Sequence, residues 1–397
     1  MSEAFESVQK REARHFLPVV NRVPVAIVSG SGSKVTDIDG KTYIDLTAGW
    51  GVTSIGHCHP SLAKAIADQA ATLMQTTNLF YTLPQLDLIE KLSLITPANI
   101  TRSFLTNSGT EAIEGAIKLA HRATKRSGFI SAQNSFHGRT LGALSLIGQD
   151  SYREPFSALL NDTTIVPYGD VSAVEKVVNE KTAAVVIEPI QGEGGVNVPP
   201  AGYLAELSEI CHRQGALLIL DEIQTGIGRT GRWLGLEHDG AKPDIITLGK
   251  GLGGGFPVAA FLCTEELAHT ASPGEHGGTY IGNPLAAVAA NSVLEVIEKE
   301  QIVENAARLG KIFSGELEKF VKENPGLARE TRGRGLLQGL VLNDMEKASK
   351  IPLHAAKKGV LVNVTAGNVI RFFPPLNIRD SELMEAWHVI QDIIQET

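Results

Sequence analysis

A single lysine, Lys250, ends an apolar run and is surrounded by glycines in the stretch DIITLGKGLGGGF, residues 244–256. A lysine amine becomes a nucleophile when burial lowers its pKa, and it then forms a Schiff base with a carbonyl group. Glycines beside it let a flat ligand approach the backbone closely. A phosphate-binding P-loop has the order GxxxxGK[ST], with the lysine near the end and a hydroxyl residue after it, and this stretch lacks that order. The pattern therefore favours a lysine that binds a carbonyl compound covalently.

Two carboxylates follow other apolar runs: Glu188 comes after AVVI, and Asp221 comes after LLIL. A single carboxylate in such a place commonly marks only the point where a strand meets solvent. If these runs and the one before Lys250 are parallel strands, all three side chains converge on the edge of the sheet where ligands bind. Pyridoxal phosphate offers a carbonyl to a lysine and a pyridine nitrogen to an acid. Lys250 and Asp221 therefore predict a site for this cofactor.

The phosphate of such a cofactor needs a binding place, and the stretch TNSGTEAIEGAIKLAHRATK, residues 106–125, offers one. Ser108, Gly109 and Thr110 directly precede an amphipathic helical pattern, whose first backbone N–H groups and dipole favour an anion. Ser108 and Glu111 also fit the S-x-x-E pattern of a helix capping box. The two interpretations are compatible.

The loop NSFHGRT, residues 134–140, places an aromatic residue, a histidine and an arginine together. Phe136 is suited to stacking on a flat ring, and Arg139 is suited to holding a carboxylate through two hydrogen bonds. Taken alone, such residues are ordinary in a loop.

Two further motifs resemble a dinucleotide-binding loop and a metal site, but the residues around them do not favour either function. GIGRTG, residues 226–231, matches the dinucleotide pattern GxGxxG, but the residues after it form a poor helix, so we do not expect nicotinamide binding. GHCHP, residues 56–60, holds two histidines and a cysteine too close together to surround one ion. Pro60 indicates the first turn of a helix instead, and no metal is expected.

The elements that position these residues follow an α/β pattern. Residues 100–265 alternate short β-branched runs with longer helical patterns, which predicts a mostly parallel central sheet between helices. Residues 1–48 contain a hairpin pattern around an Asp-Gly turn. The pattern of residues 283–397 predicts long helices followed by short strands. We therefore expect a large cofactor-binding domain at 49–282, and a smaller α+β domain formed by 1–48 and 283–397.

The composition of the chain narrows the function classes. The 397 residues are 43% hydrophobic, enough for a large core, and no apolar run approaches the roughly 18 residues of a membrane span. A net charge of −8 without a basic tract gives no reason to expect nucleic-acid binding. Cys58, Cys211 and Cys263 form no CxxC pair and are expected to be reduced thiols. Without a signal-like N-terminus, we expect a cytoplasmic protein with a small-molecule ligand.

Taken together, the motifs resemble those of the class III, fold-type I, pyridoxal phosphate-dependent aminotransferases, and most closely the acetylornithine and ornithine branch. The resemblance covers nearly the whole chain. It is carried by GHCHP, TNSGTEA, FHGRT, EPIQGEGGV, LLILDEIQTGIGRTG, ITLGKGLGGGFP, HGGTYIGNPLA and VIRFFPPL.

For the cofactor, the resemblance implies that Lys250 binds its aldehyde and later moves a proton, and that Asp221 pairs with the pyridine nitrogen. Gln224 matches the contact to the ring hydroxyl, and Phe136 matches the stacking aromatic. Thr279 matches a residue that reaches the phosphate of the neighbouring subunit, which implies a homodimer with shared sites. The phosphate loop matches Ser108, Gly109 and Thr110.

For the substrates, the resemblance implies that Arg139 holds the α-carboxylate of an ornithine-like amino donor. Arg371 corresponds to the residue that binds the α-carboxylate of glutamate or 2-oxoglutarate, and Glu193 to the acid that covers it between half-reactions. Glu188 lies at the edge of the site. The expected activity is an ω-aminotransferase that moves the terminal amine of N-acetylornithine, or a close analogue, to 2-oxoglutarate in a ping-pong mechanism, giving the semialdehyde and glutamate.

Three residues depart from the family pattern and bear on the amino donor. Gly278 replaces a serine in HGGTY. Trp50 stands where acetylornithine enzymes commonly have a small or aliphatic residue and ornithine enzymes a tyrosine, and it would narrow the mouth of the pocket. Lys34 replaces a tyrosine of ornithine enzymes, and its charge disfavours the second ammonium of free ornithine. This favours an acylated donor. Ornithine, 4-aminobutyrate or another ω-amine remain the alternatives, as does, more remotely, an aminomutase that lacks the paired arginines.

Overall fold

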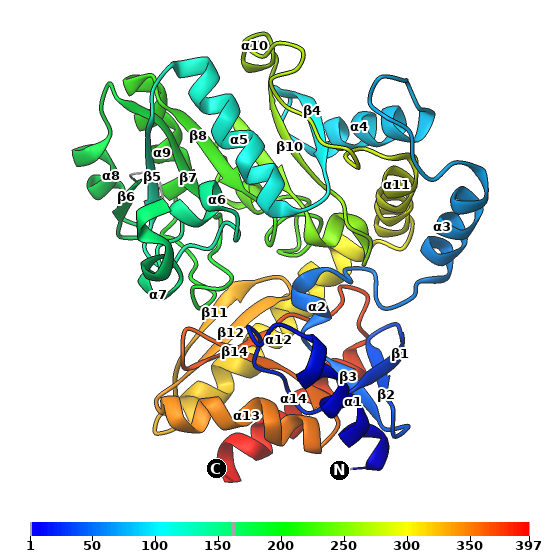
Figure 1. Cartoon of the computed structure of the whole chain (residues 1–397). Coiled ribbons are helices and arrows are strands. Elements are labelled where there is room, and N and C mark those ends of the chain that lie inside the picture. Colours follow the sequence, from blue (N-terminus) through cyan, green and yellow to red (C-terminus); the bar gives the residue numbers. More distant parts are fainter. Residues whose placement is uncertain (1, 160–162, 397) are drawn as a thin grey trace.

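The structure is a computed structural model that describes residues 2–159 and 163–396, and it shows an upper and a lower part in the view of Figure 1. The upper part is built around a seven-stranded sheet of order β4-β10-β9-β8-β7-β5-β6. β10 runs antiparallel to β4 and β9, and the other neighbours pair in parallel, so the predicted mostly parallel sheet is confirmed. The strands are β4 (Ile100–Thr106), β5 (Gly128–Ala132), β6 (Thr163–Val166), β7 (Thr182–Ile187), β8 (Leu217–Asp221), β9 (Ile245–Leu248) and β10 (Ala259–Thr264).

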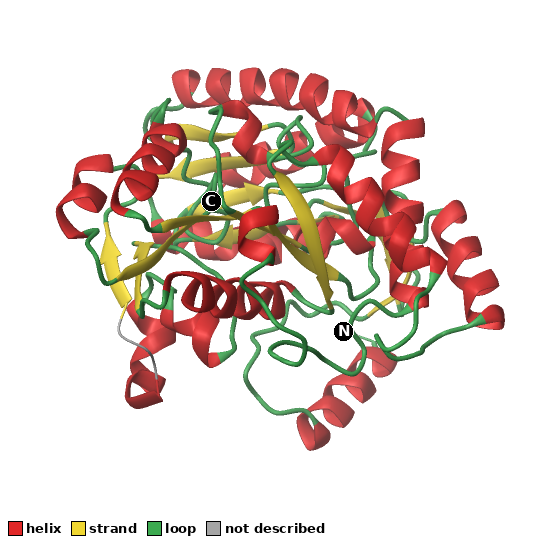
Figure 2. Cartoon of the chain, turned by 90° about the horizontal axis from the view of Figure 1, so that it is seen from above, coloured by secondary structure: helices red, strands yellow, loops and turns green. Residues whose placement is uncertain are grey.

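Both faces of this sheet are covered by helices, as Figure 2 shows from above. Side chains alternate across a strand, so Ile219 of β8 joins the core on the face covered by α5 (Gly109–Thr124). Its neighbour Leu220 joins the core on the opposite face, where Leu207 of α9 (Tyr203–Gln214) packs. Burial on both faces explains why these strands read as continuous apolar runs.

Capping side chains and prolines in the first turn determine where several helices of the upper part begin. The Asn283 side chain accepts a hydrogen bond from the Ala286 N–H at 2.8 Å, and Pro284 occupies the first turn of α11 (Pro284–Lys299). Pro60 likewise begins α3, which confirms the helix predicted after GHCHP. α11 packs against α3 and α4. The remaining elements of the upper part are α3 (Pro60–Thr72), α4 (Leu83–Ile95), α6 (Leu141–Ser145), α7 (Asp150–Arg153), α8 (Val171–Val177), α10 (Glu265–Ala268) and the 3₁₀ turns η1 (Glu154–Leu159), η2 (Gly235–His238) and η3 (Lys250–Gly253). The short α2 (Ala48–Gly51) lies where the upper and lower parts meet.

The lower part contains two four-stranded sheets, of order β1-β2-β3-β13 and β11-β12-β15-β14. β2 and β3 pair in antiparallel register around the Asp-Gly turn, which confirms the hairpin predicted near the N-terminus. The C-terminal strands therefore lie beside N-terminal ones, since β13 pairs with β3. The strands are β1 (Ile27–Ser31), β2 (Lys34–Asp37), β3 (Thr42–Asp45), β11 (Ala328–Arg334), β12 (Leu337–Leu342), β13 (Val360–Leu361), β14 (Asn363–Thr365) and β15 (Val369–Phe372).

An aromatic cluster joins the helices of the lower part to its second sheet. Trp387 of α14 (Asp380–Glu396) lies edge-on to Phe313 and Phe320 of α12 (Ile302–Glu323) and to Phe372 of β15. Such pairs contribute about 0.5–1.5 kcal/mol each beyond the area they bury. The other helices here are α1 (Glu3–His15) and α13 (Met345–Lys357).

Within residues 2–159 and 163–396, no helix is long and apolar enough to cross a membrane. The division of the chain at residues 48 and 283 into two domains stays a prediction, as does its cytoplasmic location.

Candidate active site

Lys250 lies two residues beyond the end of β9, with a left-handed backbone (φ 44°). Non-glycine residues in this conformation are strained, and they gather at functional sites. The side chain keeps some contact with solvent. Burial of its ammonium group nevertheless lowers the pKa of Lys250 to about 8, with Arg371 acting in the same direction and Glu193 and Asp221 opposing. A substantial fraction of the amine is therefore neutral, and nucleophilic, near neutral pH.

Asp221 ends β8, the strand beside β9, and its carboxylate is buried in a network of hydrogen bonds. One oxygen accepts from the Ile223 N–H at 3.0 Å and from the Thr247 hydroxyl at 3.2 Å. The other lies 2.7 Å from Nδ1 of His137. These bonds fix the direction in which the carboxylate points.

His137, which the sequence analysis noticed but gave no role, is the partner of Asp221 in this network. It is buried, and its Nε2 lies 3.3 Å from the Ser131 hydroxyl. Burial alone would lower the pKa of His137, but the hydrogen bond and charge of Asp221, together with the charge of Glu188, raise it overall. The signal that could have found it is a histidine in the loop after β5, the strand next to β7.

Glu188 follows β7 and completes the row of three strand ends predicted from the sequence. It accepts hydrogen bonds from the Phe136 N–H at 3.2 Å and the Gly192 N–H at 3.4 Å. Burial raises the pKa of Glu188 to about 7. Its carboxylate therefore holds the loop of Phe136 against the sheet edge.

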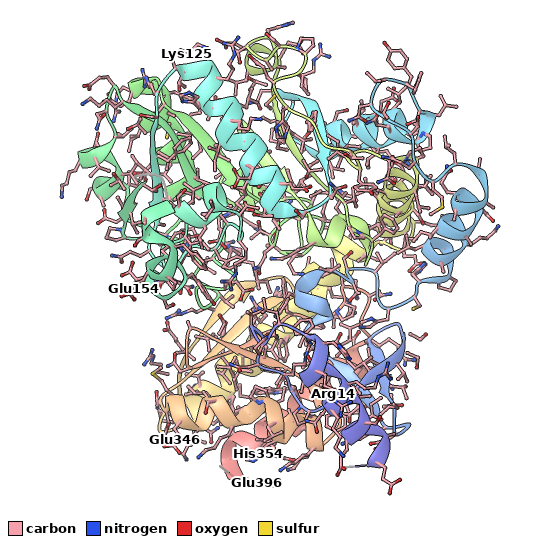
Figure 3. The ribbon with its side chains drawn as sticks, viewed as in Figure 1. Arg14, Lys125, Glu154, Glu346, His354 and Glu396 are labelled. Atoms are coloured by element: carbon pink, nitrogen blue, oxygen red, sulfur yellow. The ribbon has the colours of Figure 1, made fainter. Side chains whose placement is uncertain are left out.

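The N-terminus of α5 points into the same region. Figure 3 shows Lys125, just past the last turn of α5, at the outer surface of the upper part, so the first turn faces the lower part. The Ser108 hydroxyl caps the helix by accepting from the Glu111 N–H at 3.4 Å, which is the first half of the predicted capping box. The Glu111 carboxylate accepts from the N–H of Asn107, at 2.7 Å, instead of that of Ser108. Among the described residues, the N–H groups of Gly109 and Thr110 have no hydrogen-bond partner.

Glycines allow three distant segments to meet at this helix end. A Cβ on Gly109 would lie 2.7 Å from the Ile223 side chain, and one on Gly138 would overlap Thr110. The Thr110 and Thr140 hydroxyls are 2.7 Å apart. The loops after β4, β5 and β8 therefore form a tight backbone cradle, and its free N–H groups suit an anion.

A second cluster lies where the lower part meets this edge. Arg371 of β15 has no exposed surface, and its Nη1 donates to Oε1 of Glu193 at 2.6 Å. Gln224 donates from Nε2 to the same oxygen at 3.1 Å. Burial would raise the pKa of Glu193, but the charges of Arg371 and Lys250 lower it overall, so its carboxylate is ionised at neutral pH.

One nitrogen of Arg371, Nη2, is buried and has no hydrogen-bond partner among the described residues. A buried N–H group without a partner costs free energy, of the order of 1–3 kcal/mol. A ligand carboxylate is the group that would satisfy it, since guanidinium and carboxylate match through two parallel hydrogen bonds.

Other predicted substrate residues lie outside these two clusters. Arg139 is exposed and stacks over Tyr152, 4.1 Å from the ring centre, and over Phe136 at 5.3 Å. Tyr152 was missed by the sequence analysis. Trp50 is 60% exposed, with a left-handed backbone (φ 61°). The Lys34 ammonium lies 3.7 Å from a Glu382 carboxylate oxygen.

Thr279 lies on an exposed segment, where its carbonyl accepts a hydrogen bond from the Gln75 side chain. Within the described residues, no group of three or more His, Cys, Asp or Glu side chains could hold a metal ion. GIGRTG lies in turns and opens no helix.

This fold and site define an enzyme that handles amines and carboxylates, and comparison with known proteins identifies its class. The model of the family "Aminotransferase class-III" matches residues 17–394. The chain therefore belongs to the class III aminotransferases, and it is a pyridoxal phosphate-dependent transaminase that takes an amino donor and a keto acid.

Individual relatives are similar along almost their whole length. An acetylornithine aminotransferase of Methanothermobacter thermautotrophicus is 43% identical, with 98% of this chain and 99% of the relative covered. One from Mycobacterium tuberculosis is 46% identical, with 91% and 89% covered. Among solved structures, the ornithine aminotransferase of Toxoplasma gondii superposes with a TM-score of 0.95 at 34% identity, covering 100% and 96% of the two chains. The acetylornithine aminotransferase of Elizabethkingia anophelis gives 0.87 at 32%, covering 99% of each.

The residues gathered here fit the family's cofactor. Free N–H groups in a glycine-lined cradle suit its phosphate, and the oriented Asp221 carboxylate suits its ring nitrogen. Lys250, whose pKa lies near 8, suits its aldehyde. The individual contacts of Phe136, Gln224 and Thr279 with the cofactor stay predictions.

Proposed function

We propose that the protein is an ω-aminotransferase that moves the terminal amine of N-acetylornithine, or a close analogue, to 2-oxoglutarate in two half-reactions. The observation that carries this proposal is the buried Arg371, held by Glu193 yet with one nitrogen unpartnered. The names of the relatives at 43–46% identity support N-acetylornithine as the donor.

Pyridoxal phosphate, when bound, supplies an aldehyde for covalent attachment and a ring that withdraws electrons from the reacting carbon. Lys250 would hold the aldehyde, and its freed amine would then carry a proton to and from the substrate. Asp221, oriented by His137, would keep the ring nitrogen protonated. Ser108, Gly109 and Thr110 would hold the phosphate at the first turn of α5.

The two substrates would use different arginines in one pocket. Arg139 is exposed, and it would take the α-carboxylate of the donor, leaving the terminal amine to react. In this half-reaction Glu193 stays on Arg371 and neutralises its buried charge. When 2-oxoglutarate arrives, its α-carboxylate would displace Glu193 and engage both Arg371 nitrogens. The exchange lets one site accept two unlike substrates without leaving a buried charge unpaired.

We further propose that the active enzyme is a homodimer with shared sites. Leu79, Phe80, Tyr81 and Leu83 form an exposed apolar patch, here called the 79–83 patch, in which Tyr81 is 96% exposed. Contiguous apolar surface of this kind marks protein interfaces. Gln75, just before the patch, binds the backbone of Thr279, which would reach the partner's cofactor phosphate.

The test compares kcat/KM for N-acetylornithine, ornithine and 4-aminobutyrate, each with 2-oxoglutarate. We expect N-acetylornithine to be preferred by about tenfold or more, because a charged second ammonium is costly to desolvate. A preference for ornithine or 4-aminobutyrate would reject the donor assignment. Borohydride reduction of the yellow holoenzyme should label Lys250, and Lys250→Ala should abolish both labelling and turnover. Turnover without added 2-oxoglutarate would favour an aminomutase instead.

A further inference from the structure

Arg229, in the GIGRTG motif, carries a buried guanidinium group without an acidic partner among the described residues. Its side chain is 2% exposed, and its Nη1 donates only to backbone carbonyls, those of Leu336 at 2.9 Å and Pro374 at 2.6 Å. Its Nη2 has no hydrogen-bond partner in the described part of the chain. Buried charges are normally paired, because desolvation is costly. A buried arginine without an acidic partner therefore indicates a specific role for this residue.

The bonds of Arg229 join the loop after Gln224 to β15, which carries Arg371, and to the neighbouring strand β12. The Arg229 carbonyl accepts from the Leu336 N–H at 3.0 Å, so Leu336 is held from both sides. Leu336 directly precedes β12, and Pro374 lies two residues beyond β15. In the pairing of these two strands, Gly339 lies opposite Arg371. Arg229 therefore forms hydrogen bonds beside the first residue of β12 and beyond the last residue of β15, which lie at the same end of this strand pair.

The second link between the two arginines is an aromatic ring. The guanidinium carbon of Arg229 lies 4.3 Å from the centre of the Phe373 ring, and that of Arg371 lies 5.2 Å from the same centre. Phe373 follows β15 and packs directly on Gly51, beside Trp50. Both cations of this region thus contact one phenyl ring. Consistent with this proximity, burial and the charge of Arg371 lower the pKa of Arg229 to about 9.

We propose that Arg229 is a positioning residue for carboxylate recognition, which holds Arg371 in place through Phe373 and the strand ends and adds a second positive charge behind it. This inference rests on the proposed function and deepens it. Two cations near one carboxylate site attract a dicarboxylate acceptor more strongly than a monocarboxylate. The GIGRTG motif then serves the keto-acid substrate rather than a dinucleotide.

The test measures binding to the holoenzyme by calorimetry, with glutarate as an unreactive dicarboxylate and butyrate as the monocarboxylate comparison. Arg229→Met should weaken glutarate binding by about tenfold or more, because the two hydrogen bonds from Nη1 and the charge are both lost. Arg229→Lys keeps the charge but not the planar fork, so a smaller loss of about threefold is expected. Butyrate also binds Arg371, so its affinity should fall, but less than that of glutarate, and the rate of the donor half-reaction should change by less than about twofold.

The matched control is Arg232→Met, which removes an exposed arginine from the same loop and should leave glutarate binding unchanged. Wild-type glutarate affinity in the Arg229 variants would overturn the inference, as would a donor half-reaction that falls as far as glutarate affinity does. If Arg229→Met does not fold, Arg229→Lys decides by the same two criteria. An Arg371→Gln variant that binds glutarate normally would instead overturn the proposed function. If Arg371→Gln lost glutarate binding and the Arg229 variants kept it, the role of Arg229 would be rejected and the proposed function would stand.

Discussion

Arg371 and Glu193 form a partly buried ion pair, with Nη1 and Oε1 2.6 Å apart, although 178 residues separate them in the chain. The arginine side chain has no exposed surface, while that of Glu193 is 26% exposed. The acid is therefore the partner with room to move. In this pair the buried charge of Arg371 is compensated by a group that, in the proposed function, a substrate carboxylate would replace.

Replacing Glu193 by glutamine removes the competitor for Arg371 while keeping its size. We expect the KM for 2-oxoglutarate to fall by about threefold to tenfold, and the donor half-reaction to slow, because Arg371 is then left uncompensated. Stopped-flow absorbance of each half-reaction measures both effects. Glu330→Gln is the control, since Glu330 pairs with Arg332 at 2.5 Å outside this cluster. Unchanged 2-oxoglutarate kinetics in Glu193→Gln would argue against the displacement of Glu193 by the acceptor.

His137 should matter for cofactor binding through Asp221. In His137→Phe, Asp221 loses a charge-assisted hydrogen bond, which is typically worth about 1.5–3 kcal/mol. We expect the Kd of pyridoxal phosphate to rise by about tenfold or more, measured by titrating the apoenzyme and following its absorbance. His212→Asn is the control, because His212 makes a similar pair with Asp244, at 3.2 Å, with its side chain 48% exposed. Equal cofactor affinity in wild type and His137→Phe would refute the role.

Glu222 should make stability depend on pH. Burial raises its pKa to about 7, although Thr225 and the N–H groups of Gly235 and Leu236 donate to it. Because the folded pKa lies above the unfolded value, its stabilising contribution is complete below about pH 4.5 and is lost as the pH rises through about 7. A shift of this size corresponds to at most about 3 kcal/mol.

Glu222→Gln cannot ionise, so between about pH 5 and pH 8 its free energy of unfolding should fall less than that of wild type, by about 1–3 kcal/mol. Urea unfolding of the two apoproteins at both pH values gives this difference. Glu188, whose pKa is also raised to about 7, contributes the same trend to both proteins and cancels in the comparison. If the free energies of unfolding of the two proteins changed equally with pH, the pKa of Glu222 would be the same in the folded and unfolded states, and the prediction would be wrong.

The 79–83 patch should be needed for assembly. The double change Leu79→Glu and Tyr81→Glu places two charges on surface that the dimer would bury, at a cost of several kcal/mol. We expect a monomer by light scattering after gel filtration, with loss of turnover. Met345→Glu, at a residue that is 62% exposed on α13, should leave both properties unchanged. A double variant that remains a fully active dimer would place the interface elsewhere.

Much of the site could be predicted because parallel strands end at one edge. Lys250, Asp221 and Glu188 each follow an apolar run, and β9, β8 and β7 are neighbours in the sheet. His137 could not be assigned in this way, since its partner Asp221 is 84 residues away and belongs to a different strand. Arg229 was considered only within the rejected dinucleotide pattern and the longer family motif LLILDEIQTGIGRTG, and it was given no role, because the sequence does not tell whether an arginine in a glycine-rich turn is buried.

By itself, the sequence determined the period of the strands and helices, the caps of α5 and α11, and the residue types at the strand ends, since these depend on neighbours along the chain. Tertiary structure alone decided which charges share a buried space. It set Arg371 on Glu193 and placed Arg229 and Arg371 against one phenyl ring. The physical reason is that desolvation and Coulomb energies depend on distance and burial in three dimensions, which the order of residues does not contain.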